Sequence, residues 1–239
     1  ETANLTGLTI GQPVFVRVYT YGAGIASNFN ICVGTAPPPP ANDDCAGAVA
    51  LTVNTGMSCT SQTAGTVQSA TNSGIAVTPC AGTADDDVWY SFTASQATHI
   101  VSLNGVAGSV TSMNFQVFSG VCGTLTSVAC GATGSAPTTT VNSLTAGQVY
   151  YVRVYTNTST GGQNTTFNIC VTTPPVGPPV NDNCAGAVGL TVNAGQTCTS
   201  QTFGTVFGAT GTADATCAGA EDDDVWYSFV PTATAHRVS

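Results

Sequence analysis

The sequence predicts an all-β protein of tandem, jelly-roll-type β-sandwich domains, joined by Pro-rich linkers and stapled by disulfides. Three observations predict this fold class. Thr, Val, Tyr and Phe, which favour pleated sheets, occur throughout the chain, whereas the helix former Lys is absent. Ten Cys residues stand in a chain of which only 6% is charged, which is typical of disulfide-bonded proteins outside the cell. Long blocks of the sequence also occur twice, and such repetition decides the architecture.

The repeated unit is about 138 residues long. The block 42–63 returns at 181–202 with 17 of its 22 positions identical, and DDDVWYSF at 85–92 returns unchanged at 222–229. We therefore divide the chain into the C-terminal part of a preceding repeat, a Pro-rich linker, a complete repeat, a second Pro-rich linker and the N-terminal part of a following repeat: 1–33, 34–41, 42–171, 172–180 and 181–239. Successive prolines are extended and stiff, so the linkers act as spacers.

Two interpretations of the partial repeats are open. They are a window onto a longer array, or they complete each other between molecules by strand donation. The combined halves would lack the equivalents of residues 103–136, which would leave an open sheet edge and a hole in the core. We favour the longer array.

Strand signals recur along the complete repeat at the spacing of a sandwich. The expected strands are 48–53, 58–67, 87–93, 98–104, 113–118, 125–130, 138–144, 149–156 and 166–172. In the strand DVWYSF, alternation places Val88, Tyr90 and Phe92 on one face and Trp89 on the other. In YYVRVY, Tyr150, Val152 and Val154 alternate in the same way with Tyr151, Arg153 and Tyr155.

Charge and hydropathy exclude several classes of protein. The net charge is −9, and only three residues are basic, so the chain lacks the basic surface that nucleic-acid binding needs. A hydrophobic content of 42% is too high for a disordered acidic tail. No apolar run approaches the roughly 18 residues of a membrane helix, and the start of the sequence does not resemble a signal peptide.

The complete repeat holds six cysteines that we expect to be disulfide-bonded: Cys45, Cys59, Cys80, Cys122, Cys130 and Cys170. We expect Cys122 to pair with Cys130 across a short hairpin, and Cys59 to pair with Cys80 across one connection. Two cysteines of the next repeat are expected to be bonded as well: Cys198 and Cys217.

The remaining cysteines, Cys45 and Cys170, leave two options. They join each other and clamp the first strand to the last, or Cys170 joins Cys184 and Cys45 joins Cys32 across the linkers. Stiff prolines resist folding back over so few residues, so we favour Cys45–Cys170. In that case a pulling force would pass through one covalent link and leave the domain unloaded.

The acidic residues form a second candidate site. The run Asp85, Asp86 and Asp87 recurs at 222–224, and such oxygen-rich clusters can hold Ca²⁺. Adjacent residues of a strand point to alternate faces, however, so a solvated acidic turn is the favoured interpretation. Arg153, like its equivalent Arg17, is a candidate for a structural ion pair with one of these carboxylates or for stacking on Trp89 or a tyrosine.

Catalysis finds little support. The acids of the complete repeat fall in two short runs, 43–44 and 85–87, which do not suggest two carboxylates facing each other across a cleft. His99 lies in a predicted strand without an obvious nucleophile. Exposed aromatics such as Trp89 or Tyr155 could form a platform for a sugar, but such residues more often fill a sandwich core.

Three segments carry a resemblance to a known family: DDDVWYSF, VFSGVCGTL, and LTAGQVYYVRVYT with the later FNICV. Over about residues 85–171 the unit resembles the bacterial pre-peptidase C-terminal domain. Its N-D-x-C-x-x-A opening with regular cysteines is similar to tandem units of large Bacteroidota surface proteins, which include type IX-secreted adhesins. The resemblance implies a β-sandwich accessory module at a bacterial surface, without catalysis.

We therefore expect a non-catalytic repeat of an extracellular filament or stalk that mediates adhesion. Its expected partners are neighbouring repeats, like chains in a fibre, and a polysaccharide or other surface. The alternatives are a unit that binds polysaccharide itself and an accessory module that tethers a secreted hydrolase. No cofactor is expected apart from the Ca²⁺ alternative.

Overall fold

The computed structural model describes residues 5, 7–211 and 222–239. The chain divides into two compact units, one of Glu1–Val53 with Ser61–Val171 and one of Asn54–Thr60 with Thr172–Ser239. In the described part, the helical segments are the single 3-10 turns η1 (Cys45–Gly47) and η2 (Cys184–Gly186), and no helix is long and apolar enough to cross a membrane. The prediction of an all-β fold is confirmed.

The first of two sheets has five strands in the order β1-β4-β9-β6-β7. Their bounds are Val49–Ala50, Val88–Thr93, Val149–Thr156, Met113–Val121 and Thr124–Cys130. β1 runs parallel to β4, and the other neighbours are antiparallel. We call this sheet A.

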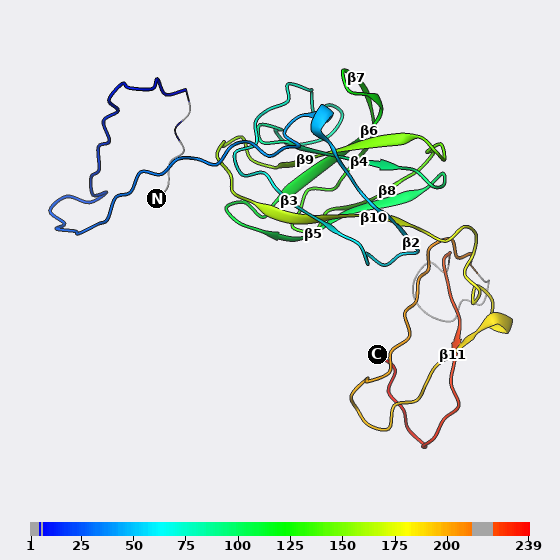
Figure 1. The fold of residues 1–239 in the computed structure, drawn as a ribbon. Coiled ribbons are helices and arrows are strands. Elements are labelled where there is room, and N and C mark those ends of the chain that lie inside the picture. The colour runs from blue at the N-terminus through cyan, green and yellow to red at the C-terminus, as the bar shows by residue number, and fades with distance from the viewer. Residues whose placement is uncertain (1–4, 6, 212–221) are drawn as a thin grey trace. The chain divides into compact units, whose positions relative to one another are not determined.

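The second sheet, sheet B, has the order β2-β10-β5-β8, and β3 also pairs with β10. The bounds of its strands are Val53–Thr55 for β2, Thr166–Thr173 for β10, His99–Ala107 for β5, Thr138–Val141 for β8 and Thr63–Thr66 for β3. Figure 1 shows the two sheets as the layers of a sandwich, with β4, β6 and β9 in one layer and β3, β5 and β10 in the other.

The hydrophobic core lies between the two sheets. Val88, Tyr90 and Phe92 of β4 belong to it, as do Val152 and Val154 of β9. Alternation in these strands therefore predicted the buried face correctly. The jelly-roll-type β-sandwich that the sequence predicted is the fold of the complete unit.

The first two predicted strands differ from the structure. The stretch 48–53 does not form one strand, because β1 belongs to sheet A whereas β2, which starts at Val53, belongs to sheet B. The chain thus changes sheets at Leu51, whose side chain is in the core. Of 58–67, only Thr63–Thr66 is a strand.

The predicted cysteine pairs are wrong, although all six cysteines of the unit are disulfide-bonded. Cys45 bonds Cys122, and Cys80 bonds Cys130; Cys59 and Cys170 are disulfide-bonded as well. Cys122 lies in the turn between β6 and β7, whereas Cys130 is the last residue of β7. The length of β7 puts the two cysteines more than about 20 Å apart, far beyond the roughly 7 Å that a disulfide can span.

The other two predicted disulfides do not form because the fold brings their cysteines to other partners. Cys45 packs against Trp89 and Phe118 on the outer face of sheet A, whereas Cys170 is in β10 of sheet B, so the Cys45–Cys170 pair does not form. The predicted Cys59–Cys80 pair does not form either, because the loop that carries Cys80 reaches Cys130.

Cysteines outside the complete unit have free thiols where the structure describes them. Cys32, Cys184 and Cys198 are free and exposed, so the expected disulfide at Cys198 is not formed, and Cys217 lies outside the described residues. Cys184 is the equivalent of Cys45 in the next repeat. The alternative pairing across the linkers is also contradicted.

The segment that precedes the first linker forms no strand in its described residues, 5 and 7–33. Its equivalents in the complete unit form β9 and β10. β9 there lies between β4 and β6. In the segment before the linker, apolar side chains such as Phe15 and Tyr21 are exposed.

Candidate functional site

The residues that the sequence marked for chemistry meet on the outer face of sheet A. Trp89 of β4 and Gln116 of β6 are the register partners of Arg153 in β9 on either side. The guanidinium also lies over the rings of Trp89, Phe118 and Tyr155, at 5.7, 5.5 and 5.3 Å from their centroids. We call Arg153 with its polar and aromatic neighbours the Arg153 cluster.

Every polar contact of the Arg153 side chain holds part of the protein itself. Nη2 donates to Gln116 Oε1 at 2.6 Å and to the carbonyl of Ala76 at 3.1 Å. Nη1 donates to the carbonyl of Ile75 at 2.5 Å and lies 3.5 Å from Asp87 Oδ2. Arg153 has no exposed surface, so the cluster ties the loop between β3 and β4 to the sheet.

The electrostatics of the cluster are dominated by burial. Burial raises the pKa of Asp87, although the hydroxyl and amide of Ser73 and the charge of Arg153 oppose this. Burial also lowers the pKa of Arg153, against the attraction of Asp87. The ion pair that the sequence suggested is thus present between two buried side chains, at 3.5 Å. Each partner is also held by other groups of the protein, Asp87 by Ser73 and Arg153 by Gln116 and two carbonyls.

Asp86 points to a different partner. Its carboxylate accepts the amide N–H of Thr156 at 3.0 Å and the Thr156 hydroxyl at 2.7 Å. Burial raises its pKa to about 6, and the charges of Asp85 and Asp87 add to the effect of burial. The side chain therefore anchors the start of β4 to the end of β9.

The calcium alternative gains no support from these contacts. Asp86 and Asp87 each hold separate protein groups, as the alternation of a strand requires. Among the described residues, which include Asp85, Asp222, Asp223 and Asp224, no three His, Cys, Asp or Glu gather where they could hold a metal ion. For Arg17, the described part of the chain offers the ring of Tyr19 at 5.4 Å but no carboxylate.

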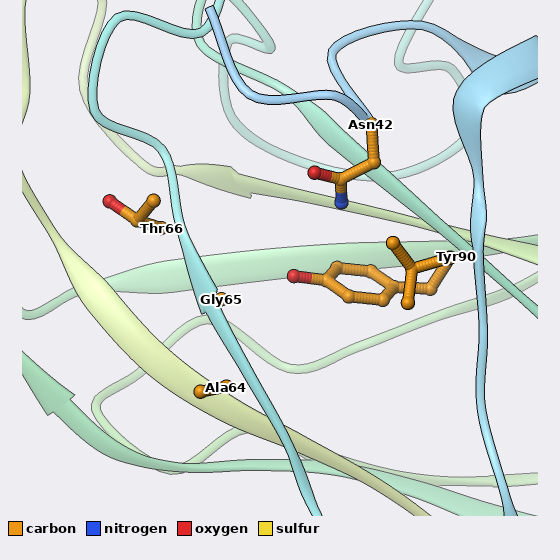
Figure 2. Close-up of a pocket in the computed structure, with 6 residues that line it drawn as sticks. Asn42, Ala64, Gly65, Thr66 and Tyr90 are labelled. Carbon is orange, nitrogen blue, oxygen red and sulfur yellow. The ribbon is translucent and has the colours of Figure 1, made fainter. Parts of the chain in front are cut away.

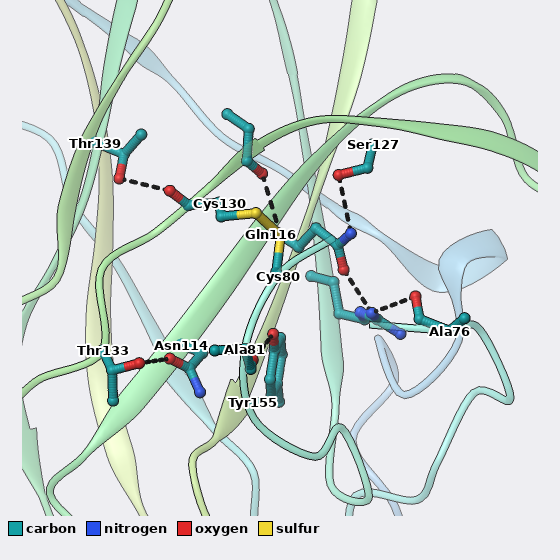
Figure 3. The surroundings of a disulfide bond; sticks show 12 residues. Ala76, Cys80, Ala81, Asn114, Gln116, Ser127, Cys130, Thr133, Thr139 and Tyr155 are labelled. Carbon is teal, nitrogen blue, oxygen red and sulfur yellow. Dashed lines mark hydrogen bonds between the residues drawn. A yellow bond between two sulfur atoms is a disulfide. The ribbon is translucent and has the colours of Figure 1, made fainter. Parts of the chain in front are cut away.

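The loop of residues 67–87 lies across the outer face of sheet A, and Figure 3 shows the contacts that hold it. Cys80 is bonded to Cys130 at the end of β7, and the hydroxyl of Tyr155 donates to the carbonyl of Ala81 at 2.7 Å. Gln116 lies beside this disulfide and donates to the hydroxyl of Ser127 at 2.9 Å. We call residues 67–87 the strap.

The remaining candidates for chemistry are also structural. His99 is fully buried, and its Nε2 accepts the backbone N–H groups of Ser95 at 3.0 Å and Gln96 at 3.3 Å. Trp89 and Tyr155 have no exposed surface. The sugar platform suggested for these two aromatics is therefore wrong.

A shallow hollow opens where β1 of sheet A lies near β3 of sheet B, with a volume of about 280 Å³. Its lining residues are Asn42, Val49, Ala64, Gly65, Thr66 and Tyr90. In Figure 2 the Tyr90 hydroxyl points toward Gly65, and an added Cβ at Gly65 would overlap that hydroxyl. Burial raises the pKa of Tyr90 to about 12, and a hydrogen bond with Asn42 opposes this shift. The hydroxyl is therefore neutral and can donate.

Asn42 is a structural residue of this region that sequence reasoning did not identify. Its side-chain amide donates to the carbonyl of Trp89 at 2.9 Å, and the Trp89 amide donates to the Asn42 carbonyl at 2.8 Å. These bonds fix the chain where it leaves the linker. The sequence contained a signal for it, because an Asn stands 47 residues before the Trp in one repeat and 45 residues before it in the next.

The following unit repeats the same contacts. Asn181 donates to the carbonyl of Trp226 at 3.0 Å, and β11 (Val188–Gly189) runs parallel to β12 (Tyr227–Ser228) as β1 does to β4. Asp182 accepts the amide and hydroxyl of Thr210, as Asp43 does for Thr71. We call the bonds between Asn42 and Trp89 and between Asp43 and Thr71, with their equivalents in the following unit, the opening clip.

Comparison with known proteins found one family model that matches the chain. Its description is galactose binding domain-like, it is associated with type IX secretion, and it matches residues 41–169 and 180–236. None of the curated proteins matches the chain. Among solved structures, the periplasmic inhibitor of g-type lysozyme, PliG, from Aeromonas hydrophila shares 15% identity with a TM-score of 0.28, over 50% of this chain and 96% of the inhibitor. The family model thus covers most of both predicted repeats.

Proposed function

Because the chain belongs to the galactose binding domain-like family associated with type IX secretion, we propose that it is a structural segment of an extracellular filament or stalk that mediates adhesion at a bacterial surface. The family indicates a non-catalytic module of a secreted protein. The finer role, a spacer that presents an adhesive end away from the cell, is our proposal.

The observation that carries this proposal is the opening clip. In both units the bonds between the Asn and the Trp fix the chain where it leaves a Pro-rich linker. A stiff linker that enters each unit through the same bonds keeps neighbouring units apart. Such a connection suits a chain that spans distance.

The burial of several charged and titratable side chains of the unit supports the same role. Arg153, Asp87 and His99 have no exposed surface, and Asp86 is 1% exposed. Each is engaged by the protein's own backbone or side chains, as described above. None of them is available to a substrate.

Electron micrographs of the intact secreted protein test the proposal. We expect thin fibres with beads that repeat at the spacing of one unit and its linker. A compact globule without such periodicity would contradict the proposed spacer role.

The hollow at Tyr90 favours one alternative, in which the unit is a polysaccharide-binding accessory module of a secreted hydrolase. The hollow is lined by side chains that are polar but uncharged, the amide of Asn42, the phenol of Tyr90 and the hydroxyl of Thr66, which suits an uncharged polyol rather than an anion. The equivalent of Ala64 in the next repeat is Phe203, so Ala64→Phe fills the hollow with a residue that the repeat already tolerates. Binding on a glycan array that Ala64→Phe removes would support this function, whereas the absence of any glycan signal would exclude it.

A further inference from the structure

The two edges of sheet A are built very differently. At one edge, β1 has only two residues and follows Asp43 and Asp44. At the other edge, β7 has seven residues, TLTSVAC, without charge or proline. One side of β7 pairs with β6, and no strand of the described chain pairs with its other side.

The charges of the complete unit are segregated away from β7. Between Asp87 and Arg153 the sequence holds no Asp, Glu, Lys or Arg. Asp86, Asp87 and Arg153 are themselves buried. The remaining charge resides at the exposed Asp44 and the half-buried Asp43 and Asp85, near the start of the unit and the end of the strap.

An edge strand with free N–H and C=O groups is a template for another strand, and proteins usually guard such edges with charges, proline or a short length. β7 carries one guard, a bulge opposite Val117 and Phe118. Before the bulge, however, Thr124–Ser127 pairs regularly with Phe118–Val121. Thr124 and Thr126 are exposed along this regular run.

We propose that the free edge of β7 docks the β7 edge of a second copy of this chain, as an antiparallel pair centred on Leu125, in which Thr124 of each copy faces Thr126 of the other. A strand edge is complementary to itself in the antiparallel sense, so two identical copies can meet about a two-fold axis. Opposed threonines form favourable cross-strand pairs. An uncharged edge on a chain of net charge −9 is the place where two copies meet with the least repulsion. The contact joins neighbouring chains side by side, which goes beyond the spacer role of one chain.

Sedimentation velocity of the full chain tests this contact. The free thiols at Cys32, Cys184 and Cys198 are alkylated first, so that disulfide-linked oligomers do not form. Thr126→Lys places a charge on the edge strand β7, and Thr93→Lys places the same charge on an exposed position of the interior strand β4. Melting curves of both variants check that the sandwich remains folded.

We expect the unmodified chain and Thr93→Lys to dimerise with similar constants. We expect Thr126→Lys to dimerise at least about tenfold more weakly, because the two lysines lie diagonally on the same face of the pair and repel each other. Hydrogen exchange should also show concentration-dependent protection of amides within 124–127. A chain that stays monomeric overturns the proposal, as does equal weakening by both lysines. A unit that fails to dimerise but still appears as beads in micrographs would leave the spacer role intact.

Discussion

A single arginine organises the outer face of sheet A. Arg153 reaches two strap carbonyls, an amide side chain and a carboxylate, and it lies against three aromatic rings. The planar guanidinium can make all these contacts at once, which the point charge of a lysine cannot. The sequence left open whether Arg153 forms an ion pair or stacks on an aromatic ring, and in the structure it does both.

Asp86 makes the stability of the unit depend on pH. Its pKa is raised from 3.8 to about 6 in the folded chain, so the protonated form is favoured by folding. The stabilisation is fully present below the unfolded pKa and is lost as the pH rises through about 6, by about 3 kcal/mol at pH 7. Asp87, whose pKa is also raised, acts in the same direction.

We expect Asp86→Asn to remove most of this loss. The amide cannot ionise, its oxygen can accept the amide of Thr156, and its NH₂ can donate to the Thr156 hydroxyl. Urea unfolding at pH 4.5 and pH 7.5 measures the effect. The unmodified chain should be less stable at the higher pH, and the variant should lose clearly less. An identical loss in the two proteins would show that Asp86 ionises without cost.

At the scale of elements, the strap is the part of the fold that the sequence did not predict. Strand positions followed from alternation, because a half-buried strand must alternate. The strap has no such period, and its position depends on which groups it covers. Ser73, Ile75 and Ala76 look like ordinary loop residues until Arg153 and Asp87 are brought beneath them.

The cysteine pairs could not be deduced for a related reason. Six cysteines allow 15 pairings, and proximity in the sequence misled the choice. The disulfides follow the fold instead, since Cys45 and Cys80 both reach the ends of β7. Only a known topology places those ends.

The strap supports a prediction about its own disulfide. The Cys80–Cys130 bond closes a separation of 50 residues, which corresponds to about 4 kcal/mol in the chain-entropy model. We expect the double variant Cys80→Ser with Cys130→Ser to lose up to that amount in urea unfolding. Its strap amides should stay protected from hydrogen exchange, because Arg153 and Tyr155 still hold the carbonyls of Ile75, Ala76 and Ala81.

The matched control is the double variant Cys45→Ser with Cys122→Ser, which opens the other disulfide and leaves the strap contacts in place. If the strap exchanges freely in the first variant while the strands remain protected, the disulfide alone holds it.

At the scale of the whole molecule, the disulfides decide how the chain bears tension. The Cys45–Cys122 bond takes the residues between its ends, a separation of 77 positions, out of the path of a pulling force. The sequence suggested one link from Cys45 to Cys170, but the observed bond starts at the same residue and ends on the β6–β7 hairpin. This bond therefore spans β1 to β6.

Pulling single chains by their ends, with and without reductant, measures this length. Reduction should release at least about 260 Å of additional contour length, since 77 residues extend by roughly 3.4 Å each. Alkylated, reduced chains provide the control in which the bond cannot reform. Equal contour lengths under both conditions would contradict the shielding.

The burial of Arg153 has one more consequence for a protein outside the cell. Trypsin-like proteases cut after Lys or Arg, and the complete unit has no Lys and no other Arg. The one bond that such a protease could cut follows Arg153, which is buried in the central strand β9 and covered by the strap. While it stays folded, the unit offers such enzymes nothing to cut from Asn42 to Val171, so its survival among digestive enzymes is governed by how rarely it unfolds.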